Sequence, residues 1–158
     1  IPQETALQLQ RCFDDARTAF FDFFPGIESW LAQLRQHFTL GVITNGPEFS
    51  QVVKVERVNL KDKVDFVIIG GQEPEQKPHP SIFVKALRLA HCEKQHALHI
   101  GDSLAADIQG ANNAGIDSVW ISHGQDLADN SPIVPSHIIE TPGQLPDLIA
   151  QLQAKHAR

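Results

Sequence analysis

The sequence predicts an α/β fold in which helices cover both faces of a parallel sheet. Short apolar runs alternate with amphipathic helical patterns along the chain, and polar turn residues follow the runs where strand gives way to helix. The predicted strands are residues 39–44, 65–69, 97–100, 118–121 and 137–139. Parallel strands are buried on both faces and read as short apolar stretches. We therefore expect a three-layer, Rossmann-like arrangement.

Helical periodicity accounts for most of the segments between these strands. A first helix is predicted over about residues 3–20, and a second places Ile27, Trp30, Leu31 and Leu34 on one face. The helix after the first strand ends at Asn59, a residue that tolerates the left-handed conformation of a helix cap. Further amphipathic helices are predicted after Pro80 and over residues 145–152.

Composition excludes several classes of protein. The 158 residues are 42% hydrophobic and 20% charged, with a formal net charge of −6. These are ordinary values for a globular domain, and the negative charge argues against a general nucleic-acid binder. No apolar stretch approaches the length of a membrane span, and no signal peptide is visible. Cys12 and Cys92 are lone thiols in unrelated segments, so we expect a cytoplasmic protein with reduced cysteines rather than a disulfide.

Two carboxylates lie where the strand at 97–100 gives way to a helix. Asp102 ends the strand in Gly101-Asp102-Ser103, and Asp107 follows one helical turn later. Carboxylates at such a strand end suit Mg²⁺, which takes one or two of them and keeps several waters. Asp102 alone is equally compatible with a simple helix cap.

Two upstream loops carry further candidate groups. Thr44-Asn45-Gly46 ends a strand and opens into a helix, where a hydroxyl and free backbone N–H groups can hold an anion. Turn chemistry alone also explains Asn45-Gly46. Lys77 precedes two prolines that stiffen its loop, whereas an isolated lysine is more often a solvated surface charge.

Taken in order, these three loops resemble the second, third and fourth motifs of the haloacid dehalogenase-like hydrolases. The resemblance runs from about Phe24 to about His123 and is closest to the phosphatase branch. It implies a Mg²⁺-dependent phosphomonoester hydrolase that acts on a small phosphorylated metabolite through an aspartyl-phosphate.

The resemblance also implies a role for each candidate residue. Thr44, Lys77 and Asp107 are the implied catalytic residues, and Asp102 is the implied Mg²⁺ ligand. Substrate phosphate is held by Thr44, Asn45, Gly46 and Lys77. For Ser103 we favour capping of the following helix over a direct role in the site.

The first motif of the family is missing from this sequence. That motif is a strand ending in Asp-x-Asp, which supplies the nucleophile and a general acid/base, and no Asp-x-Asp occurs here. Asp14 and Asp15 fall on a predicted helix face, and Asp22 has no acidic partner at the required spacing. The sequence begins with Ile1 and contains no methionine, which favours a piece of a longer protein. We expect this chain to be inactive alone.

In the family the missing strand lies in the middle of the sheet, between the strands ending at Thr44 and Ile100. Its loss would leave two unpaired strand edges, which proteins normally cover. Either the missing N-terminal segment or a second copy covers these edges, or the two strands close up against each other. Residues 1–24 are then expected to be the C-terminal part of a helical cap, and residues 25–158 the core.

Three alternatives remain open from the sequence. The family's metal-independent haloacid dehalogenases share the fold, although the Gly-Asp-Ser motif favours the phosphatases. A non-catalytic pseudoenzyme or binding module would also explain the missing nucleophile. A zinc site is the third alternative, with His91, Cys92, His96 and His99 as its ligands. The spacing of these residues is unusual for paired zinc ligands.

Overall fold

The computed structural model describes residues 2–6, 8–9, 12, 16 and 21–156. Its strands form two parallel sheets. Strand β1 (Gly41–Thr44) pairs with β2 (Phe66–Ile69), with Gly41 opposite Phe66 and Thr44 opposite Ile69. Strands β3 (Leu98–Gly101), β4 (Asp117–Ile121) and β5 (His137–Ile139) form the second sheet in that order. The predicted parallel α/β class is confirmed.

The described strands β1 and β3 do not pair with each other. They are the neighbours that the sequence predicted on either side of a missing central strand. The alternative in which these two strands close up against each other is therefore wrong for this structure. Each keeps one edge without a strand partner among the described residues.

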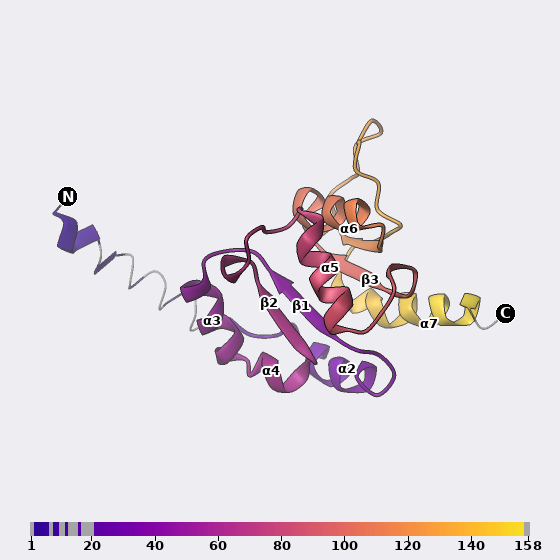
Figure 1. Ribbon diagram of the computed structural model, residues 1–158, viewed down its shortest axis with the longest axis horizontal. Coiled ribbons are helices and arrows are strands. Elements are labelled where there is room, and N and C mark those ends of the chain that lie inside the picture. Colours follow the sequence, from indigo (N-terminus) through magenta and orange to yellow (C-terminus); the bar gives the residue numbers. More distant parts are fainter. Residues whose placement is uncertain (1, 7, 10–11, 13–15, 17–20, 157–158) are drawn as a thin grey trace.

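The helices follow the predicted pattern and lie between and around the strands (Figure 1). They are α2 (Ile27–Leu34), α3 (Glu48–Arg57), α4 (Leu60–Lys63), α5 (Pro80–Leu89), α6 (Gln109–Ala114) and α7 (Leu145–His156). Asn59 and Gly115 adopt left-handed conformations beyond the ends of α3 and α6, with φ angles of 48° and 71°. Asn59 is the helix stop that the sequence predicted. The short helix α4 was not predicted.

The segment after Asp102 is less regular than expected. A π-helical turn, η3 (Leu104–Ile108), precedes α6 and contains Asp107. Such turns are uncommon and frequently occur at functional sites. Ser103 begins the turn, and its hydroxyl accepts a 3.1 Å hydrogen bond from the Ala106 N–H, which is the capping role favoured from the sequence.

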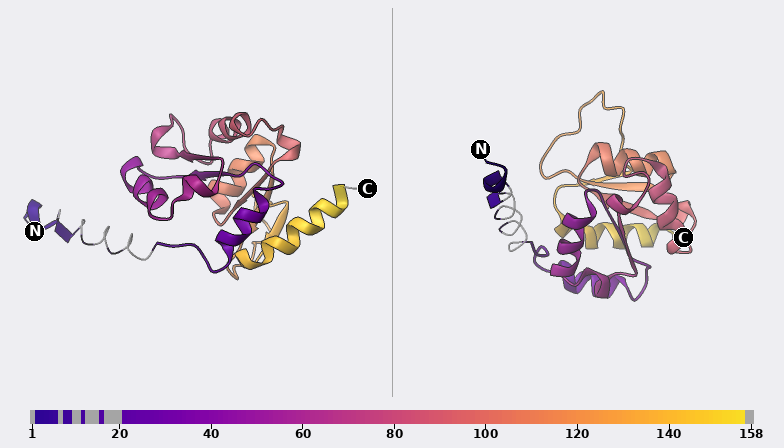
Figure 2. Two further views of the ribbon diagram at one scale, coloured as in Figure 1. Left: turned by 90° about the horizontal axis from the view of Figure 1, so that it is seen from below. Right: turned by 60° about the vertical axis from the view of Figure 1, so that its left-hand side comes forward.

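Two apolar clusters place helices on both faces of the strands. On one face, Ile82 and Phe83 of α5 and Ala111 of α6 pack with Ile68 of β2. On the other, Val119 of β4 packs with Leu145 of α7 and Trp30 of α2. The side views show helices on either side of the strands (Figure 2). The cluster under α5 also includes Ile43 of β1 and Ile116 beside β4, so it joins the two sheets.

The described N-terminal residues stand apart from this core. Residues 3–6 and 8–9 are helical and exposed, and the N-terminal end projects away from the body of the molecule (Figure 1). The assignment of residues 1–24 to a cap remains a prediction. No helix among the described residues has the length and apolarity needed to span a membrane.

Ile82 provides a test of the core that joins the two sheets. Its side chain is 1% exposed, whereas Val84 on the same helix is 39% exposed. We predict that Ile82→Ala lowers the free energy of unfolding by about 2–5 kcal/mol, because it leaves a cavity. Val84→Ala, the matched control, should lower it by less than about 1 kcal/mol. Urea denaturation measures both, and equal losses would contradict the assignment of this core.

Candidate active site

The ends of β1 and β3 meet at the side chain of Lys77. The Lys77 Nζ donates a 2.8 Å hydrogen bond to the Ile43 carbonyl oxygen on β1. The same ammonium lies 2.6 Å from Asp107 Oδ1 in the turn after β3. The two side chains are 10% and 8% exposed, so this is a largely buried ion pair. The structure thus brings together Lys77 and Asp107, two residues that the sequence assigned to catalysis.

Asn45 holds the Lys77 loop in place. Its side-chain Nδ2 donates to the Lys77 carbonyl oxygen at 2.8 Å, and its Oδ1 accepts from the Lys77 N–H at 3.0 Å. Two reciprocal hydrogen bonds fix the loop against the end of β1. The Asn45 side chain therefore positions Lys77, a role that the sequence did not predict.

The predicted phosphate-binding groups of Thr44 and Gly46 already have protein partners. Thr44 Oγ1 donates to Gln51 Oε1 at 2.9 Å, and the Gly46 N–H donates to Gln76 Oε1 at 2.9 Å. Gly46 has a φ of 115°, which favours glycine. To bind a phosphate oxygen, either group must exchange its glutamine partner. Sequence reasoning missed both glutamines, since no motif marks them.

Asp107 is held by three donors. Besides Lys77, His99 Nε2 lies 3.2 Å from Oδ1, and the Ser103 N–H donates to Oδ2 at 3.1 Å. Burial on its own raises the pKa of Asp107. The hydrogen bond from His99 and the charge and hydrogen bond of Lys77 outweigh burial and hold that pKa well below its ordinary value. Asp107 is therefore a carboxylate over the whole physiological pH range.

His99 also belongs to this site, although the sequence suggested it only as a ligand in the zinc alternative. Its ring stands edge-on to Phe83 of α5, with the ring centroids 4.9 Å apart. Leu98 and Ile100 pack into the cluster on the opposite face of the sheet. The strand alternation that puts His99 on the α5 face was readable from the sequence, but its contact with Asp107 was not.

Gly101 makes room for the buried carboxylate. A Cβ atom at this position would lie 2.3 Å from Asp107 Cγ, closer than atoms can approach. Any larger residue here would displace Asp107 from Lys77. The glycine at the end of β3 is thus required by the close approach of Asp107.

Asp102 differs from Asp107 in being exposed. Among the described residues, its carboxylate makes no hydrogen bond or ion pair. Its backbone carbonyl oxygen accepts a 2.9 Å hydrogen bond from Trp120 Nε1, which fixes the loop. A free carboxylate at a strand end fits one protein ligand of Mg²⁺. It is not a complete site, because the described residues contain no group of three or more potential metal ligands.

The other candidate residues do not join the site. His91, Cys92, His96 and His99 form no metal-binding group among the described residues, so the zinc alternative is wrong, and His99 bonds to Asp107 instead. Asp22 is exposed and its Oδ1 accepts the Phe23 N–H at 2.7 Å. Asp14 and Asp15 lie outside the described residues.

Comparison with known proteins decides the family. The sequence pattern described as "Haloacid dehalogenase-like hydrolase" matches residues 3–121. The chain belongs to this family. It is therefore a hydrolase by family, and the family predicted from the sequence is confirmed.

Curated relatives extend over much of this chain. The chain is 38% identical over 114 residues to the glyceraldehyde 3-phosphate phosphatase of Pyrococcus abyssi, a match that covers 72% of the chain and 48% of that protein. It is 32% identical over 130 residues to the human N-acylneuraminate-9-phosphatase, with coverage of 82% and 52%. The chain thus spans about half the length of the curated relatives it matches.

Solved structures agree with the fold. A 2-haloacid dehalogenase from Pseudomonas syringae superposes with a TM-score of 0.72 at 34% identity, covering 83% of this chain and 54% of that one. A phosphatase of the same family from Thermococcus onnurineus gives a TM-score of 0.71 at 30% identity, covering 81% and 58%. The Rossmann-like fold class is therefore confirmed.

The buried ion pair makes the stability of the protein depend on pH. The pKa of Asp107 is lower in the folded than in the unfolded chain, so its charge stabilises the fold above about pH 4 and ceases to do so as pH falls toward the folded value. We predict that Asp107→Asn lowers the free energy of unfolding by about 3 kcal/mol at pH 7, because it leaves Lys77 unpaired. The difference in the free energy of unfolding between Asp107→Asn and the unaltered chain should shrink between pH 4 and pH 3.

Urea denaturation at pH 7, 5, 4 and 3 measures this dependence. Glu75→Gln is the matched control, since Glu75 is exposed on the same loop as Lys77. It should change stability by less than about 0.5 kcal/mol at each pH. A deficit for Asp107→Asn that stays constant from pH 7 to pH 3 would show that packing, not charge, is responsible.

Proposed function

We propose that the whole protein is a Mg²⁺-dependent phosphatase that hydrolyses a small phosphorylated metabolite. The observation that carries this proposal is the buried Lys77–Asp107 pair, which contacts the Ile43 carbonyl oxygen before Thr44 and the Ser103 N–H after Asp102. A fixed positive charge at the end of parallel strands attracts a phosphoryl group. The curated relatives named above are phosphatases, which supports the same reaction class.

Each residue has a distinct part in this proposal. Lys77 supplies positive charge to phosphoryl oxygens and to the nucleophile, and Asp107 holds the Lys77 side chain in place. The Thr44 hydroxyl and the Asn45 and Gly46 N–H groups bind a phosphate oxygen once their glutamine partners are displaced. Asp102 would hold Mg²⁺, which when bound offsets the repulsion between an anionic nucleophile and phosphate.

The nucleophile of this reaction is a carboxylate from outside these 158 residues. It attacks phosphorus in line and displaces the ester oxygen of the substrate, which takes a proton from the general acid of the same motif and leaves as an alcohol. Water then attacks the phosphorus of the resulting aspartyl-phosphate, which releases inorganic phosphate and restores the carboxylate. The unpaired edges of β1 and β3 support the position of its strand, because a parallel strand between them would end beside Lys77. The missing N-terminal segment supplies this strand, or a second copy covers the edges. Residues 1–24 belong to the cap over the site.

A metal-independent haloacid dehalogenase is the second candidate. The likeness to the Pseudomonas syringae dehalogenase supports it. The unpaired Asp102 carboxylate favours the phosphatase, because a carboxylate beside the nucleophile has a clear use with Mg²⁺ and none without a cation.

The free Cys12 and Cys92 thiols support a cytoplasmic location.

The first functional prediction concerns the chain alone. We expect no hydrolysis of p-nitrophenyl phosphate and only weak Mg²⁺ binding, because one carboxylate holds a hydrated cation poorly. A peptide carrying the parent's N-terminal strand with its Asp-x-Asp should restore turnover. Activity of the bare chain, after contaminating phosphatase is excluded, would contradict the proposed catalytic apparatus. No activity in any longer form would favour the pseudoenzyme.

The second functional prediction concerns Asp102 in a longer form that carries the nucleophile motif. Asp102→Asn should lower phosphatase turnover at least a hundredfold while leaving the fold intact, since the charge is lost and the shape retained. Asp62→Asn, at an exposed position on α4, is the control and should retain activity. Equal rates for Asp102→Asn and the unaltered protein would remove the proposed metal role. Dehalogenation of a 2-haloacid without Mg²⁺ would favour the second candidate.

A further inference from the structure

Gln51 is a buried glutamine beside the end of β1. It lies near the start of α3, and the residue is 9% exposed. Its side-chain Oε1 accepts a 2.9 Å hydrogen bond from Thr44 Oγ1. Its backbone N–H donates to the Pro47 carbonyl oxygen at 3.1 Å, which fixes the residue at the start of the helix. The side-chain partner of Gln51 is thus the hydroxyl that the proposed phosphatase would use to bind phosphate.

The Thr44 hydroxyl has a single hydrogen atom to donate, together with two acceptor sites. In this structure the hydrogen is donated to Gln51 Oε1, and the Asn45 carbonyl oxygen is farther away at 3.4 Å. Phosphate oxygens are acceptors, so the same hydrogen must turn away from Gln51 before Thr44 can bind phosphate. The contact with Gln51 therefore controls where this hydrogen points.

Burial keeps Gln51 in place while this exchange occurs. Its carboxamide packs against the backbone of Gly46, where a Cβ atom would lie 2.8 Å from Gln51 Nε2. Gln76, which accepts from the Gly46 N–H at 2.9 Å, is by contrast exposed and can swing into solvent. A backbone N–H can only donate, whereas the Thr44 hydroxyl can also accept. Gln51 can therefore remain at Thr44 when phosphate binds, whereas Gln76 has to release the Gly46 N–H.

The carboxamide of Gln51 carries a donor and an acceptor on one planar group. A half-turn about its last side-chain bond exchanges Oε1 and Nε2 at nearly the same positions. We propose that Gln51 is a positioning residue for the Thr44 hydroxyl: it accepts the hydroxyl hydrogen in the free protein and donates from Nε2 to Oγ1 when phosphate is bound. The hydroxyl hydrogen is then held toward the phosphate oxygen, and both side chains keep a partner. This inference rests on the proposed function, because it takes Thr44 as a phosphate-binding residue.

Inorganic phosphate is the probe for this proposal. Its binding to the longer form that carries the nucleophile motif is measured by calorimetry at constant ionic strength. Gln51→Met keeps the size of the side chain but removes its amide donor and acceptor, and should weaken phosphate binding about threefold to tenfold, the range for one hydrogen bond. A glutamine that only competed with phosphate would give the opposite result, because its removal would free the hydroxyl. Tighter or unchanged binding by Gln51→Met would therefore overturn the proposal.

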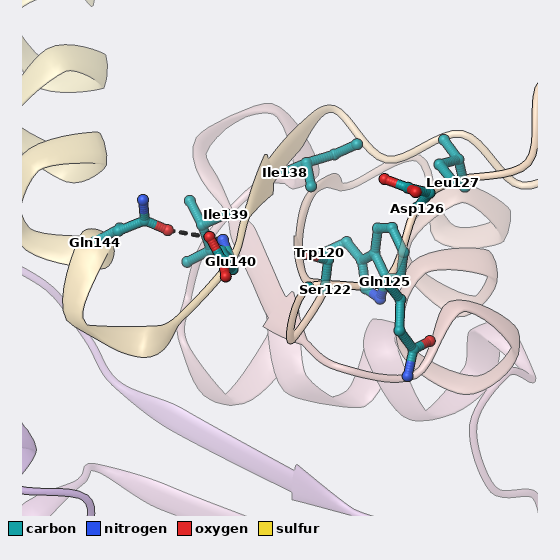
Figure 3. A pocket seen from close by; sticks show the side chains of 10 residues that line it. Trp120, Ser122, Gln125, Asp126, Leu127, Ile138, Ile139, Glu140 and Gln144 are labelled. Carbon is teal, nitrogen blue, oxygen red and sulfur yellow. Dashed lines mark hydrogen bonds between the residues drawn. The ribbon is translucent and has the colours of Figure 1, made fainter.

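The Thr44→Val background shows whether Gln51 acts through the hydroxyl. In that background Gln51→Met should change phosphate binding by less than about twofold. Gln51→Glu keeps the shape and the acceptor but has no donor when ionised, so it should weaken binding at least about tenfold, and by less in the Thr44→Val background. Gln125→Glu, which adds the same charge at an exposed position after β4 (Figure 3), should bind phosphate as the unaltered protein does. An equal effect of either Gln51 variant in both backgrounds would overturn the proposal.

The magnetic resonance signals of the Gln51 carboxamide report its rotation without any substitution at the site. They are assigned in an isotope-labelled sample by their absence from Gln51→Met. Phosphate should shift them saturably in the unaltered protein and in Thr44→Ser, which retains a hydroxyl, but far less in Thr44→Val. No saturable shift in the unaltered protein would overturn the proposal.

Hydrolysis of p-nitrophenyl phosphate by the same longer form separates this inference from the proposed function. Phosphate binding that depends on Gln51, without hydrolysis, would contradict the phosphatase and support the positioning role. Hydrolysis by the unaltered protein, with phosphate binding unaffected by Gln51→Met, would support the phosphatase and overturn the positioning role. Absence of phosphate binding by the unaltered protein would overturn both.

Discussion

The ammonium group of Lys77 and the carboxylate of Asp107 face each other between the ends of the two sheets, with little exposure to water. Removing two such charges from water is costly, and their attraction offsets that cost only when the remaining hydrogen-bonding groups are also satisfied. Here the Ile43 carbonyl oxygen accepts from Lys77, and His99 and the Ser103 N–H contact Asp107. The geometry of the candidate active site depends on this arrangement being complete.

The Lys77–Asp107 ion pair also connects two strands that are not joined by backbone hydrogen bonds. Strands β1 and β3 belong to different sheets, and no ladder hydrogen bonds connect them. Lys77 contacts the end of β1, whereas Asp107 follows β3, so the ion pair spans the gap between them. Helix α5 begins three residues after Lys77, and its buried Ile82 and Phe83 anchor the loop to the core. The packing of α5 against the core thereby sets the position of the Lys77 ammonium group.

Much of this arrangement could be predicted from the sequence, because strand runs, helix stops and the three motifs are local signals. The cap formed by Ser103 follows from such signals, and the motifs name Lys77 and Asp107 as candidate catalytic residues. The roles of Gln51, Gln76 and His99 could not be predicted, because they depend on side chains from separate elements meeting at the site. The π-helical turn around Asp107 was also unforeseen, since helical periodicity does not distinguish it from an α-helix.

A double-mutant cycle between Lys77 and Asp107 tests the central claim most directly. The free energy of unfolding is measured by urea denaturation for the unaltered chain, Lys77→Met, Asp107→Leu and the double variant. If the pair acts as a unit, each single substitution leaves a buried charge unpaired, and the double variant loses much less stability than the two singles summed. The account predicts a coupling energy of about 2 kcal/mol. A coupling energy below about 0.5 kcal/mol would contradict it.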